Sequence, residues 1–510
     1  MSTTIGKLSI ERVVIALTAT LIGALLVAVS IKALGISFTS SIAASILLAS
    51  AFVAPVARRL PVEWDGMFRR HPVISLLWLL LALLTILRTA GVALYMADPT
   101  QAQASAFWFD DFYIRHNCFS GYWQAALLAG DRVENLYDPV HYTGWAGRFK
   151  LDEFLYLPQF LILPKAGIAL GADFTQLRAV WFSLEGIILS VGMLATCIWI
   201  KNAVGRAAAL LLPLVWIASP ILLTLQLGNF QLAAIALSVM AMILFEKDRP
   251  MAGGVLLGFA VFKLFPGILG VYLLFAKRWR AAVWTFTFAI FYTLIAYAWM
   301  GEQPFTAFVN FHLPRMASGE AWAFLEQEGL GAFVAINDSV PGLVLKLKML
   351  HVSGMTRALE MQLSWAWTFL VVILTAICAR RSTAMSRSQL AATWIALLAL
   401  ASFRSPFLPD HAGLFAPLWL WSIVAASCSR TPRNYFLMAI AWLLIEAVLP
   451  VGGMPLPDET NRLLLSTVSQ FASLFLCLWV VLRKPVKTGD LDVSPSATPS
   501  RNSPLAATHV

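Results

Sequence analysis

Two adjacent carboxylates, Asp110 and Asp111, open the longest polar interruption in the first half of an otherwise apolar sequence, which runs from Phe107 to Pro158. They follow soon after a hydrophobic run. If that run crosses a bilayer, both carboxylates lie at the membrane surface, where a lipid presents its head group. A carboxylate there could act as the general base that takes a proton from a hydroxyl group. Alternatively, the two residues only solvate the loop or cap the helix expected to begin near Phe112.

A second polar turn, around residue 405, combines a side chain that can bind phosphate with one that can transfer protons. Arg404 lies at the end of one apolar run, and Asp410 and His411 begin the next. An arginine can hold two phosphate oxygens at once, and a histidine can donate or accept a proton near neutral pH. The alternative interpretation is an ordinary polar turn broken by Pro406 and Pro409.

Three charged residues fall inside apolar runs: Arg88, Glu185 and Lys263. An ion at the centre of a bilayer costs about 2.5–3.5 kcal/mol on insertion scales, so such residues need a partner or a function. Lys263 could belong to a site for a lipid phosphate or an acceptor. Equally, the three residues could form buried salt bridges that hold a helix bundle together, or line the pathway of a proton-coupled transporter.

The composition of the 510-residue chain excludes a water-soluble globule, because 59% of its residues are hydrophobic and only 13% are charged. Apolar segments recur along nearly the whole sequence, which predicts an all-α, polytopic membrane protein. The formal net charge of +10 does not indicate nucleic-acid binding, because the Lys and Arg residues occur in short clusters between the apolar runs. That distribution is typical of cytoplasmic loops.

The five cysteines predict neither a disulfide framework nor a zinc site. Only Cys118 lies in a long loop, it has no evident partner, and the sequence contains no CxxC pair. We therefore expect no bound metal ion and no cofactor.

About fourteen spans can be counted at roughly one span per 20 apolar residues. They cover residues 13–35, 38–57, 73–97, 155–171, 177–199, 205–226, 229–246, 252–275, 281–300, 362–379, 388–403, 411–427, 435–451 and 465–482. This count places both chain ends in the cytoplasm and the first large loop, with Asp110 and Asp111, outside the inner (plasma) membrane.

One turn disagrees with that topology, because Lys201 and Arg206 would face outward. The disagreement follows from counting residues 155–171, which contain Pro158 and Pro164, as a span. If this segment is instead re-entrant, several later loops change sides.

Residues 483–510 are rich in Ser, Pro and Thr and predict a disordered cytoplasmic tail. In the outer loops, residues 122–130 predict a short interfacial helix.

Several short motifs are more informative in their order than any one of them alone. They are the Asp in the first large outer loop, the Ala/Leu-rich helix ending in Gly130, Tyr137-Asp138-Pro139, Phe154 with Tyr156 and Pro158, Leu227-Gly228-Asn229 with Gln231, AGGVLLGFAVFKLFP around Lys263, the KRWRA turn, Asn337-Asp338-Ser339, and SPFLPDH ending at His411. Over residues 73–482, this order resembles glycosyltransferase family 87, polytopic enzymes of the GT-C superfamily that include polyprenol-phosphate-mannose-dependent mannosyltransferases. The resemblance implies that residues 73–482 form the main membrane domain, a GT-C-like bundle of about 12–14 transmembrane helices. It leaves residues 1–72 as an N-terminal addition of two spans with a basic linker.

The resemblance also implies an inverting transfer on the extracytoplasmic face, with an Asp of the first loop as general base and a lipid monophosphate as leaving group. The base would be Asp111, which precedes Phe112 as in the family's Asp-Phe pattern, with Asp110 as its substitute. Arg404 and Lys263 would balance the phosphate charge, and His411 would orient the donor or the acceptor. Further binding residues would be Asp410, Tyr137, Asn229, Gln231 and Asn337.

The sequence thus predicts a membrane-embedded hexosyltransferase that moves mannose or a related hexose from a polyprenyl phosphate to a lipid or glycan acceptor without a metal. The alternative is a transporter or lipid-glycan flippase in which Arg88, Glu185 and Lys263 line the pathway. An outer crevice that joins the predicted base to Arg404 and His411 would favour the enzyme. A central cavity around Lys263 between pseudo-symmetric halves would favour transport.

Overall fold

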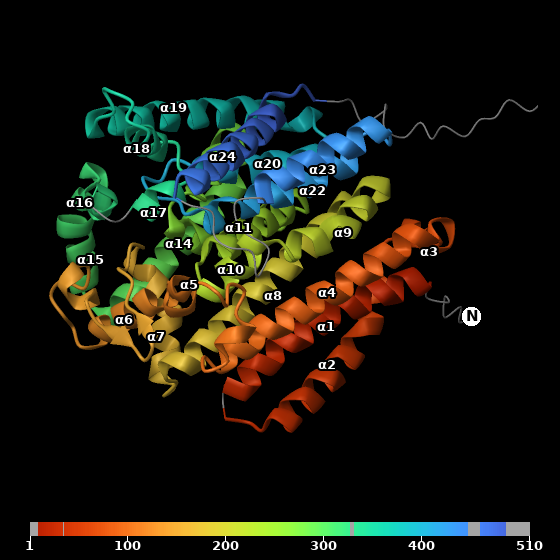
Figure 1. The fold of residues 1–510 in the computed structure, drawn as a ribbon, viewed down its shortest axis with the longest axis horizontal. Coiled ribbons are helices and arrows are strands. Elements are labelled where there is room, and N and C mark those ends of the chain that lie inside the picture. Colours follow the sequence, from red (N-terminus) through yellow and green to blue (C-terminus); the bar gives the residue numbers. More distant parts are fainter. Residues whose placement is uncertain (1–8, 34, 327–330, 447–458, 486–510) are drawn as a thin grey trace, which may run out of the picture.

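The computed structural model describes residues 9–33, 35–326, 331–446 and 459–485, which fold almost entirely into helices (Figure 1). In chain order the elements are α1 (Ile10–Ala33), α2 (Phe38–Arg59), η1 (Val62–Trp64), α3 (Met67–Arg70), α4 (Pro72–Ala97), η2 (Ala102–Ala104), α5 (Asp111–Arg115), α6 (Phe119–Gly130), η3 (Pro139–Tyr142), β1 (Trp145–Ala146), β2 (Phe149–Lys150), η4 (Pro158–Leu161), α7 (Ile162–Ala169), α8 (Phe174–Ile200), α9 (Asn202–Trp216), α10 (Ser219–Leu227), α11 (Gln231–Glu246), α12 (Pro250–Ala260), η5 (Val261–Lys263), α13 (Gly267–Phe275), α14 (Trp279–Met300), α15 (Gln303–Ala307), η6 (Phe308–His312), α16 (Leu313–Ser318), η7 (Glu320–Glu326), α17 (Gly331–Ala335), α18 (Gly342–Met349), α19 (Arg357–Arg381), η8 (Ser382–Ala384), α20 (Arg387–Ser402), α21 (Asp410–Gly413), α22 (Phe415–Ser427), α23 (Pro432–Glu446) and α24 (Glu459–Leu482). The predicted all-α class is confirmed. Most of the predicted tail, residues 486–510, lies outside the described residues.

Seven described helices are long and apolar enough to cross a membrane, namely α1, α2, α4, α8, α14, α19 and α24. The pair α9 and α10, bent by 62°, could form an eighth span. The polytopic membrane architecture is therefore confirmed. The other predicted spans correspond to helices of 8–16 residues, shorter than the roughly 20 residues that a straight span requires.

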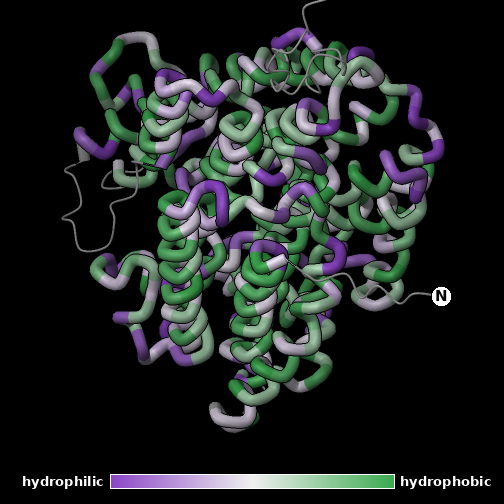
Figure 2. Tube along the Cα trace, turned by 90° about the vertical axis from the view of Figure 1, so that its right-hand side faces the viewer, coloured by the Kyte–Doolittle hydropathy of each residue, from purple (hydrophilic) through white to green (hydrophobic). Residues whose placement is uncertain are grey.

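The short helices α10, α11, α20 and α22 form the centre of the bundle. Nearly all of their side chains are buried, and apolar residues cover every side of each helix, as expected of helices that contact neither lipid nor water. Helices α2, α14 and α19 instead expose large apolar side chains, such as Phe286 and Phe369. Figure 2 shows hydrophobic residues along the helices and hydrophilic ones mainly in loops and at helix ends.

The predicted N-terminal spans pack onto the rest of the bundle. Helices α1, α2 and α4 lie side by side (Figure 1), and α1 also contacts α8. Leu26 of α1 lies over Gly186 of α8, where a Cβ would come within 2.8 Å of the leucine Cδ1. Next to it, the Ser183 hydroxyl donates a hydrogen bond to the Leu26 carbonyl oxygen (2.5 Å). Glycine thus allows the two helices to approach closely.

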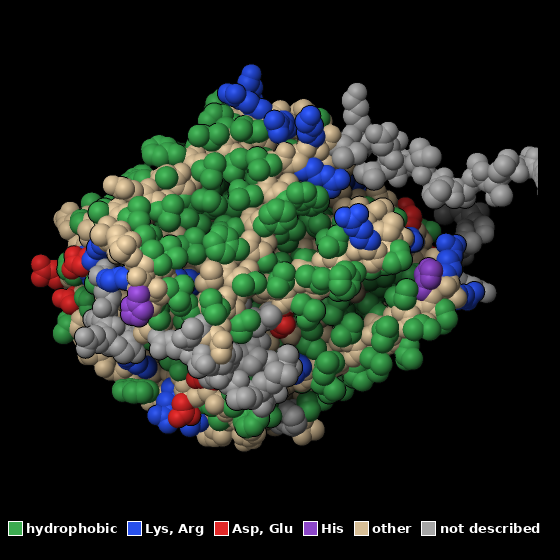
Figure 3. All heavy atoms as spheres, turned by 45° about the horizontal axis from the view of Figure 1, so that its top comes forward, with side chains coloured by type: hydrophobic (Ala, Val, Ile, Leu, Met, Phe, Trp, Pro, Cys, Tyr) green, Lys and Arg blue, Asp and Glu red, His purple; other side chains and the backbone are tan. Residues whose placement is uncertain are grey.

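The helix ends sort the charged turns into two groups. Six turns form one end of the bundle, the basic end, where α3 lies on the right of Figure 1. Lys201, Lys247, Arg278 and Arg387 line one cavity there, and Arg206 lies near Arg70 and Arg430. The turns are those with residues 58–70, 201–206, 247–249, 277–280, 380–387 and 430–433. Arg12 pairs with Asp65 there (2.8 Å), and the Arg206 guanidinium donates to the Glu63 carbonyl. The turn with Lys201 therefore lies beside the basic linker, which corrects the outward position given by the span count. Figure 3 shows a broad hydrophobic face with Lys and Arg side chains gathered at its edge.

Two segments that count as spans in the sequence do not cross the molecule. Residues 155–171 form η4 and the eight-residue α7, which is about 12 Å long and cannot cross a hydrocarbon core of about 30 Å. Residues 252–275 form a hairpin of α12, η5 and α13. Where a counted span does not cross the bundle, every later helix crosses it in the direction opposite to the one counted. The two changes therefore cancel, and the later turns keep their predicted sides relative to α4.

The α12–η5–α13 hairpin begins and ends at the basic end. Glu246, just before it, pairs with Arg278, just after it (2.6 Å). Its tip reaches the opposite end of the bundle, which we call the loop end, where the Lys263 ammonium donates to the Asn229 side-chain oxygen (3.0 Å). Leu264 follows with φ 70° and ψ −60°, and the Phe265 N–H donates to the Lys263 carbonyl (3.0 Å). This γ-turn helps to reverse the chain.

Glycines let α12 enter between α11 and α14. A Cβ at Gly253 would lie 2.4 Å from the Phe245 ring of α11, and one at Gly254 would lie 2.7 Å from the Trp284 backbone of α14. Side chains at these positions would push the helices apart. The AGGVLLG sequence is therefore what allows α12 to carry Lys263 through the bundle.

Candidate active site

Polar side chains from segments far apart in the sequence meet at the loop end in two clusters. The lysine cluster comprises Lys263, Asn229, Tyr156, Glu185, Cys118, His116 and Asp152. The aspartate cluster comprises Asp410, His411, Tyr113, Arg462, Asp110, Asp338 and Lys346. Helix α5 joins the clusters, because Tyr113 belongs to one and His116 to the other.

Lys263 is held at the tip of the hairpin by oxygen acceptors. Its ammonium donates to the Tyr156 hydroxyl and to Asn229 Oδ1, and it lies 4.1 Å from the centroid of the Tyr156 ring. Asn229 Oδ1 also accepts from the backbone N–H of Gln231, whose side chain is buried (3.1 Å). The buried carboxyl of Glu185 interacts with Lys263 electrostatically. The ammonium thus has a counter-charge but keeps donors for a further oxygen ligand.

His116 connects the lysine cluster to a carboxylate and a thiol. Its Nδ1 lies 3.3 Å from Asp152 Oδ1, and its Nε2 lies 3.9 Å from Cys118 Sγ. The amide nitrogen of Asn229 lies 3.8 Å from the same sulfur. Burial lowers the pKa of His116, and the Asp152 charge opposes that effect. The imidazole therefore tends to remain neutral with its nitrogens available as ligands or acceptors.

The two predicted bases have different surroundings. Asp110 is the N-cap of α5, and its Oδ1 accepts a hydrogen bond from Phe112 N (2.9 Å). Its charge acts on Arg462 and Tyr113, and burial, followed by Asp410 and then Asp110, raises the pKa of Tyr113. The Asp111 side chain is 85% exposed and lies 3.7 Å from Arg115. Asp110 therefore faces the aspartate cluster, whereas Asp111 faces solvent.

Asp410 and His411 are both buried, as part of α21 and the turn before it. The backbone N–H of His411 donates to Asp410 Oδ1 (2.7 Å), and the His411 carbonyl accepts from the Thr224 hydroxyl (2.6 Å). Asp410 Oδ2 and both ring nitrogens of His411 find no hydrogen-bond partner among the described residues. Buried polar atoms are normally paired, so unpaired ones suggest a site that a ligand completes.

A second carboxylate, Asp338, lies next to this pair in a fully buried network. Lys346 Nζ lies 3.6 Å from Asp338 Oδ1, and the Ser466 hydroxyl donates to the same oxygen (2.9 Å). Gln470 donates to the Asp338 carbonyl (2.8 Å). Burial raises the pKa of Asp338 to about 7, although Lys346 opposes the shift. This network ties the loop before α18 to α24 behind Asp410.

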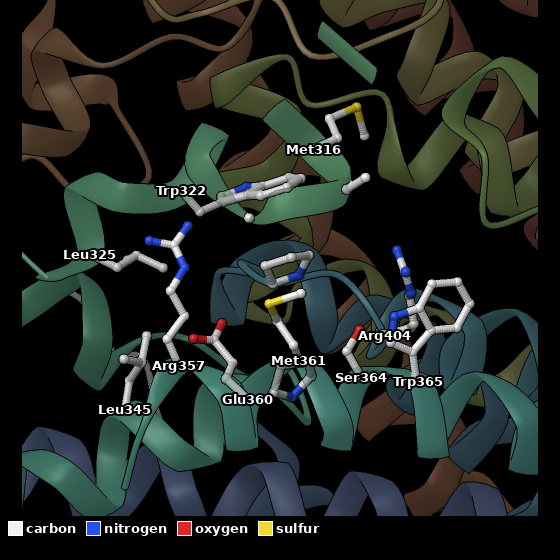
Figure 4. A pocket seen from close by; sticks show the side chains of 14 residues that line it. Met316, Trp322, Leu325, Leu345, Arg357, Glu360, Met361, Ser364, Trp365 and Arg404 are labelled. Atoms are coloured by element: carbon white, nitrogen blue, oxygen red, sulfur yellow. The ribbon is translucent and has the colours of Figure 1, made fainter. Parts of the chain in front are cut away.

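Arg404 lies in a separate pocket. Its Nε donates to the Thr368 hydroxyl (3.3 Å), and its guanidinium lies 5.8 Å from the Trp365 ring centroid. The pocket lies beside α19 (Figure 4), is open to solvent, and is lined by Met316, Ala317, Gly319, Trp322, Leu325, Pro341, Leu345, Arg357, Glu360, Met361, Ser364, Trp365, Arg404 and Pro406. The predicted base and His411 are not among these residues, so this pocket does not join Arg404 to them.

Two other predicted binding residues hold the backbone around the site. The Tyr137 hydroxyl donates to the Tyr156 carbonyl (2.8 Å), and its ring stacks on His312 (4.5 Å between centroids). Asn337 Oδ1 accepts from the backbone N–H of Leu408 (3.0 Å). These contacts position the loops that carry Lys263's partner Tyr156 and the Asp410–His411 pair.

The three charges predicted inside spans do not form one set. Glu446 of α23 is the opposite charge that acts on Arg88 of α4, whereas Glu185 of α8 acts on Lys263. The arrangement corresponds to two charge pairs, and only the pair with Lys263 belongs to the candidate site.

Sequence reasoning did not identify His116, Asp152, Tyr113, Arg462 or Lys346 as site residues. His116 and Asp152 meet because of a bridge between residues 116 and 150, which no local pattern predicts. Arg462 carried a usable signal, since it is a charge at the start of an apolar run.

Comparison with known proteins adds a family assignment. A model of glycosyltransferase family 87 matches residues 154–408, which is half of the chain. The match includes Tyr156, Asn229, Lys263 and Asp338, ends just before Asp410, and begins after Asp110. No curated protein and no solved structure matches the chain. The match over half of the sequence, together with the membrane bundle, shows that the protein belongs to glycosyltransferase family 87.

Proposed function

We propose that the protein transfers a hexose from a polyprenyl-phosphate donor to a hydroxyl group of a lipid or glycan acceptor, with inversion at the anomeric carbon and with mannose as the expected sugar. The observation that carries the proposal is that the cluster with Asp110 and the buried Asp410–His411 pair adjoins the cluster with Lys263, since His411 acts on His116. Family membership supports glycosyl transfer in general.

The distribution of charge supports a site on the extracytoplasmic face. Cytoplasmic loops carry an excess of Lys and Arg, and in this chain most of them lie in turns at the basic end. The loop end is then extracytoplasmic. Nucleotide sugars remain in the cytosol, so transfer on that face needs a donor with a lipid carrier.

We assign the general base to Asp110 in preference to Asp111. The base must lie within reach of the acceptor hydroxyl, and Asp110 faces the cluster that contains Asp410, whereas the Asp111 side chain points to solvent. Neither ring nitrogen of His411 has a hydrogen-bond partner among the described residues, although Nδ1 lies 3.6 Å from Asp410 Oδ1. The imidazole would orient the acceptor or the sugar by hydrogen bonds.

Lys263 is our candidate for stabilising the leaving phosphate. An ammonium held in a water-poor site stabilises a developing anion strongly. Asp110 is the N-cap of α5 and His116 is its C-cap, so the proposed base and the lysine cluster adjoin opposite ends of this short helix. The sugar ring would lie between them during transfer.

Arg404 would capture the donor before transfer. Its pocket beside α19 combines a cation with apolar side chains such as Trp322 and Met361, which suits the phosphate and first isoprene units of a polyprenyl phosphate.

Purified protein in detergent, assayed with radiolabelled polyprenyl-phosphate hexoses and extracted membrane lipids, tests the proposal. We expect labelled product with the wild type, a loss of roughly 10²–10⁴-fold in kcat for Asp110→Asn, as for removal of a general base, and near wild-type turnover for Asp111→Asn. If only Asp111→Asn lost turnover, Asp111 and not Asp110 would be the general base. Unchanged turnover in both variants and in the double variant would contradict the mechanism.

A further inference from the structure

Three potential metal ligands lie close together at the loop end. One ligand atom each from His116, Cys118 and Asp152 lies within 4.8 Å of the other two. In a tetrahedral zinc site the ligand atoms lie roughly 3.3–3.8 Å apart, because Zn–N and Zn–O distances are about 2.0–2.2 Å and Zn–S about 2.3 Å. The three ligand atoms would therefore have to move together by only about 1 Å to bind one zinc ion, which small side-chain rotations allow.

The backbone around these residues holds them together. Residue 116 bridges residue 150, and the Ser120 hydroxyl donates to the Lys150 carbonyl (3.0 Å) and accepts from Asp152 N (3.0 Å). At Gly121, a Cβ would lie 2.6 Å from the Asp152 carbonyl oxygen. The segment with Asp152 is thus fixed against the start of α6, close to Cys118.

The imidazole ring of His116 is also fixed in orientation. Phe112 stacks on it at 4.8 Å between centroids with an interplanar angle of 16°. A zinc ion binds only one ring nitrogen, and one nitrogen of His116 lies within 4.8 Å of a ligand atom of both Cys118 and Asp152. The stacked ring therefore needs little ordering to become a ligand, which favours metal binding.

We propose that His116, Cys118 and Asp152 bind a zinc ion with one coordination position left open. The soft thiolate together with imidazole favours zinc over magnesium or calcium. A thiolate and a carboxylate neutralise a divalent cation. The Cys118 sulfur also acts on the nearby Lys263 ammonium, which keeps Glu185 as a second counter-charge when the sulfur binds the ion. Three protein ligands and one open position are the pattern of catalytic rather than structural zinc sites.

The role of the ion follows if the proposed transfer is correct. The open position takes a phosphate oxygen of the donor, next to Lys263. When the bond between the anomeric carbon and the phosphate oxygen breaks, its electron pair passes to that oxygen, and the ion and the ammonium stabilise the charge. The acceptor oxygen bonds to the anomeric carbon and gives its proton to Asp110. This role rests on the proposed function, whereas zinc binding itself does not.

Zinc content of the full-length protein, purified without a metal-affinity step, tests the site directly. We expect about one zinc ion per chain in the wild type, and its loss in Cys118→Ser and His116→Ala. Cys428→Ser and His351→Ala, which change the same residue types away from the cluster, should retain it. Wild-type protein without zinc that also binds none on addition of zinc chloride, or full zinc content in Cys118→Ser, would overturn the proposal.

A second measurement uses the wild type alone, so that a folding defect in a variant cannot decide the outcome. After treatment with a chelator, addition of zinc chloride should protect Cys118 from alkylation, as measured by mass spectrometry, and should leave the alkylation of Cys428 unchanged. Equal alkylation of Cys118 with and without zinc would contradict the site. Cobalt in place of zinc should give a thiolate-to-metal charge-transfer band that Cys118→Ser lacks.

Transfer assays separate this inference from the proposed function. Zinc binding without transfer from any polyprenyl-phosphate hexose would leave the metal site standing and remove the proposed function. Full transfer by protein shown to be free of zinc would remove the role of the ion and leave the function standing.

Discussion

The two cations assigned to the donor differ in their surroundings, and this difference predicts different kinetic defects. Lys263 is held between Asn229 and Tyr156 in the candidate site, whereas Arg404 contacts Thr368 and Trp365 in the pocket beside α19. A group that acts on the leaving phosphate contributes to kcat. A group that only captures the donor contributes to KM.

For Lys263→Ala we therefore expect kcat to fall by roughly 10²–10³-fold, as for loss of one oxyanion-stabilising donor. For Arg404→Ala we expect kcat to be retained and KM for the donor to rise by roughly tenfold or more. A hydrogen bond to a charged group contributes about 1.5–3 kcal/mol to binding, which corresponds to a change of this size. Donor titration of both variants measures this split. Wild-type donor affinity in Arg404→Ala would exclude its role in donor binding.

Asp338 predicts a dependence of stability on pH. Burial raises its pKa from 3.8 to about 7 in the folded protein, so the folded state holds the proton more tightly than the unfolded chain. Stability should therefore fall as the pH rises from about 4 to about 7. Asp338→Asn, which keeps a side chain of similar shape, should reduce that slope.

Thermal unfolding in detergent at about pH 5 and about pH 7 compares the slopes. Asp111→Asn, at an exposed position, is the control and should behave as the wild type. An unchanged slope in Asp338→Asn would show that the carboxyl does not carry this effect.

At the level of single residues, sequence reasoning identified those whose type is unusual for their position. Lys263 is a charge in an apolar run, and Asp110, Asp410 and His411 border such runs; all four lie in the two clusters. It did not separate Asp110 from Asp111, because the difference depends on which side of α5 faces the bundle. It also missed the pairing of His116 with Asp152, which only the tertiary fold brings about.

Among the elements, the α12–η5–α13 hairpin determines where Lys263 lies. Its first helix fits between α11 and α14 only because Gly253 and Gly254 lack side chains. The apolar run from residue 252 to 275 is long enough to be counted as one span, and hydropathy does not distinguish a span from a hairpin of two short helices. The break at Lys263-Leu264-Phe265-Pro266 was the available signal.

Gly254→Ala should therefore destabilise the protein by about 1–3 kcal/mol, because the new Cβ would overlap the Trp284 backbone. It should also lower kcat, since the hairpin tip carries Lys263. Gly270→Ala in α13, where a Cβ meets nothing within 4 Å, is the matched control. Thermal unfolding and transfer assays on both variants provide the test. Equal stability of the two variants would argue against close packing at Gly254.

Over the whole molecule, most turns lie at the end of the bundle that the span count gives them relative to α4, although the segments 155–171 and 252–275 do not cross it. The errors at 155–171 and 252–275 each reversed the chain, so they cancelled for every later turn. Only the segment between them was misplaced, and there Lys201 and Arg206 had already signalled a conflict. Those residues lie at the basic end.

Labelling of single cysteines, in a background with the native cysteines replaced by serine, tests this topology. Asp248→Cys and Lys277→Cys flank the hairpin at exposed positions and should react with a membrane-impermeant maleimide from the same, cytoplasmic side. Asp131→Cys, in an exposed turn at the loop end, should react only from the opposite side. Labelling of residues 248 and 277 from opposite sides would restore a full span.

The contact of Leu26 with Gly186 has a consequence for how much of the chain is needed. The leucine fills the notch that glycine leaves in α8, and Ser183 donates its hydroxyl proton to the Leu26 carbonyl. A shortened protein that began at α4 would expose this notch in α8 to acyl chains. The first helix therefore serves as a wall of the enzyme, and truncated proteins that lack it should lose stability and activity.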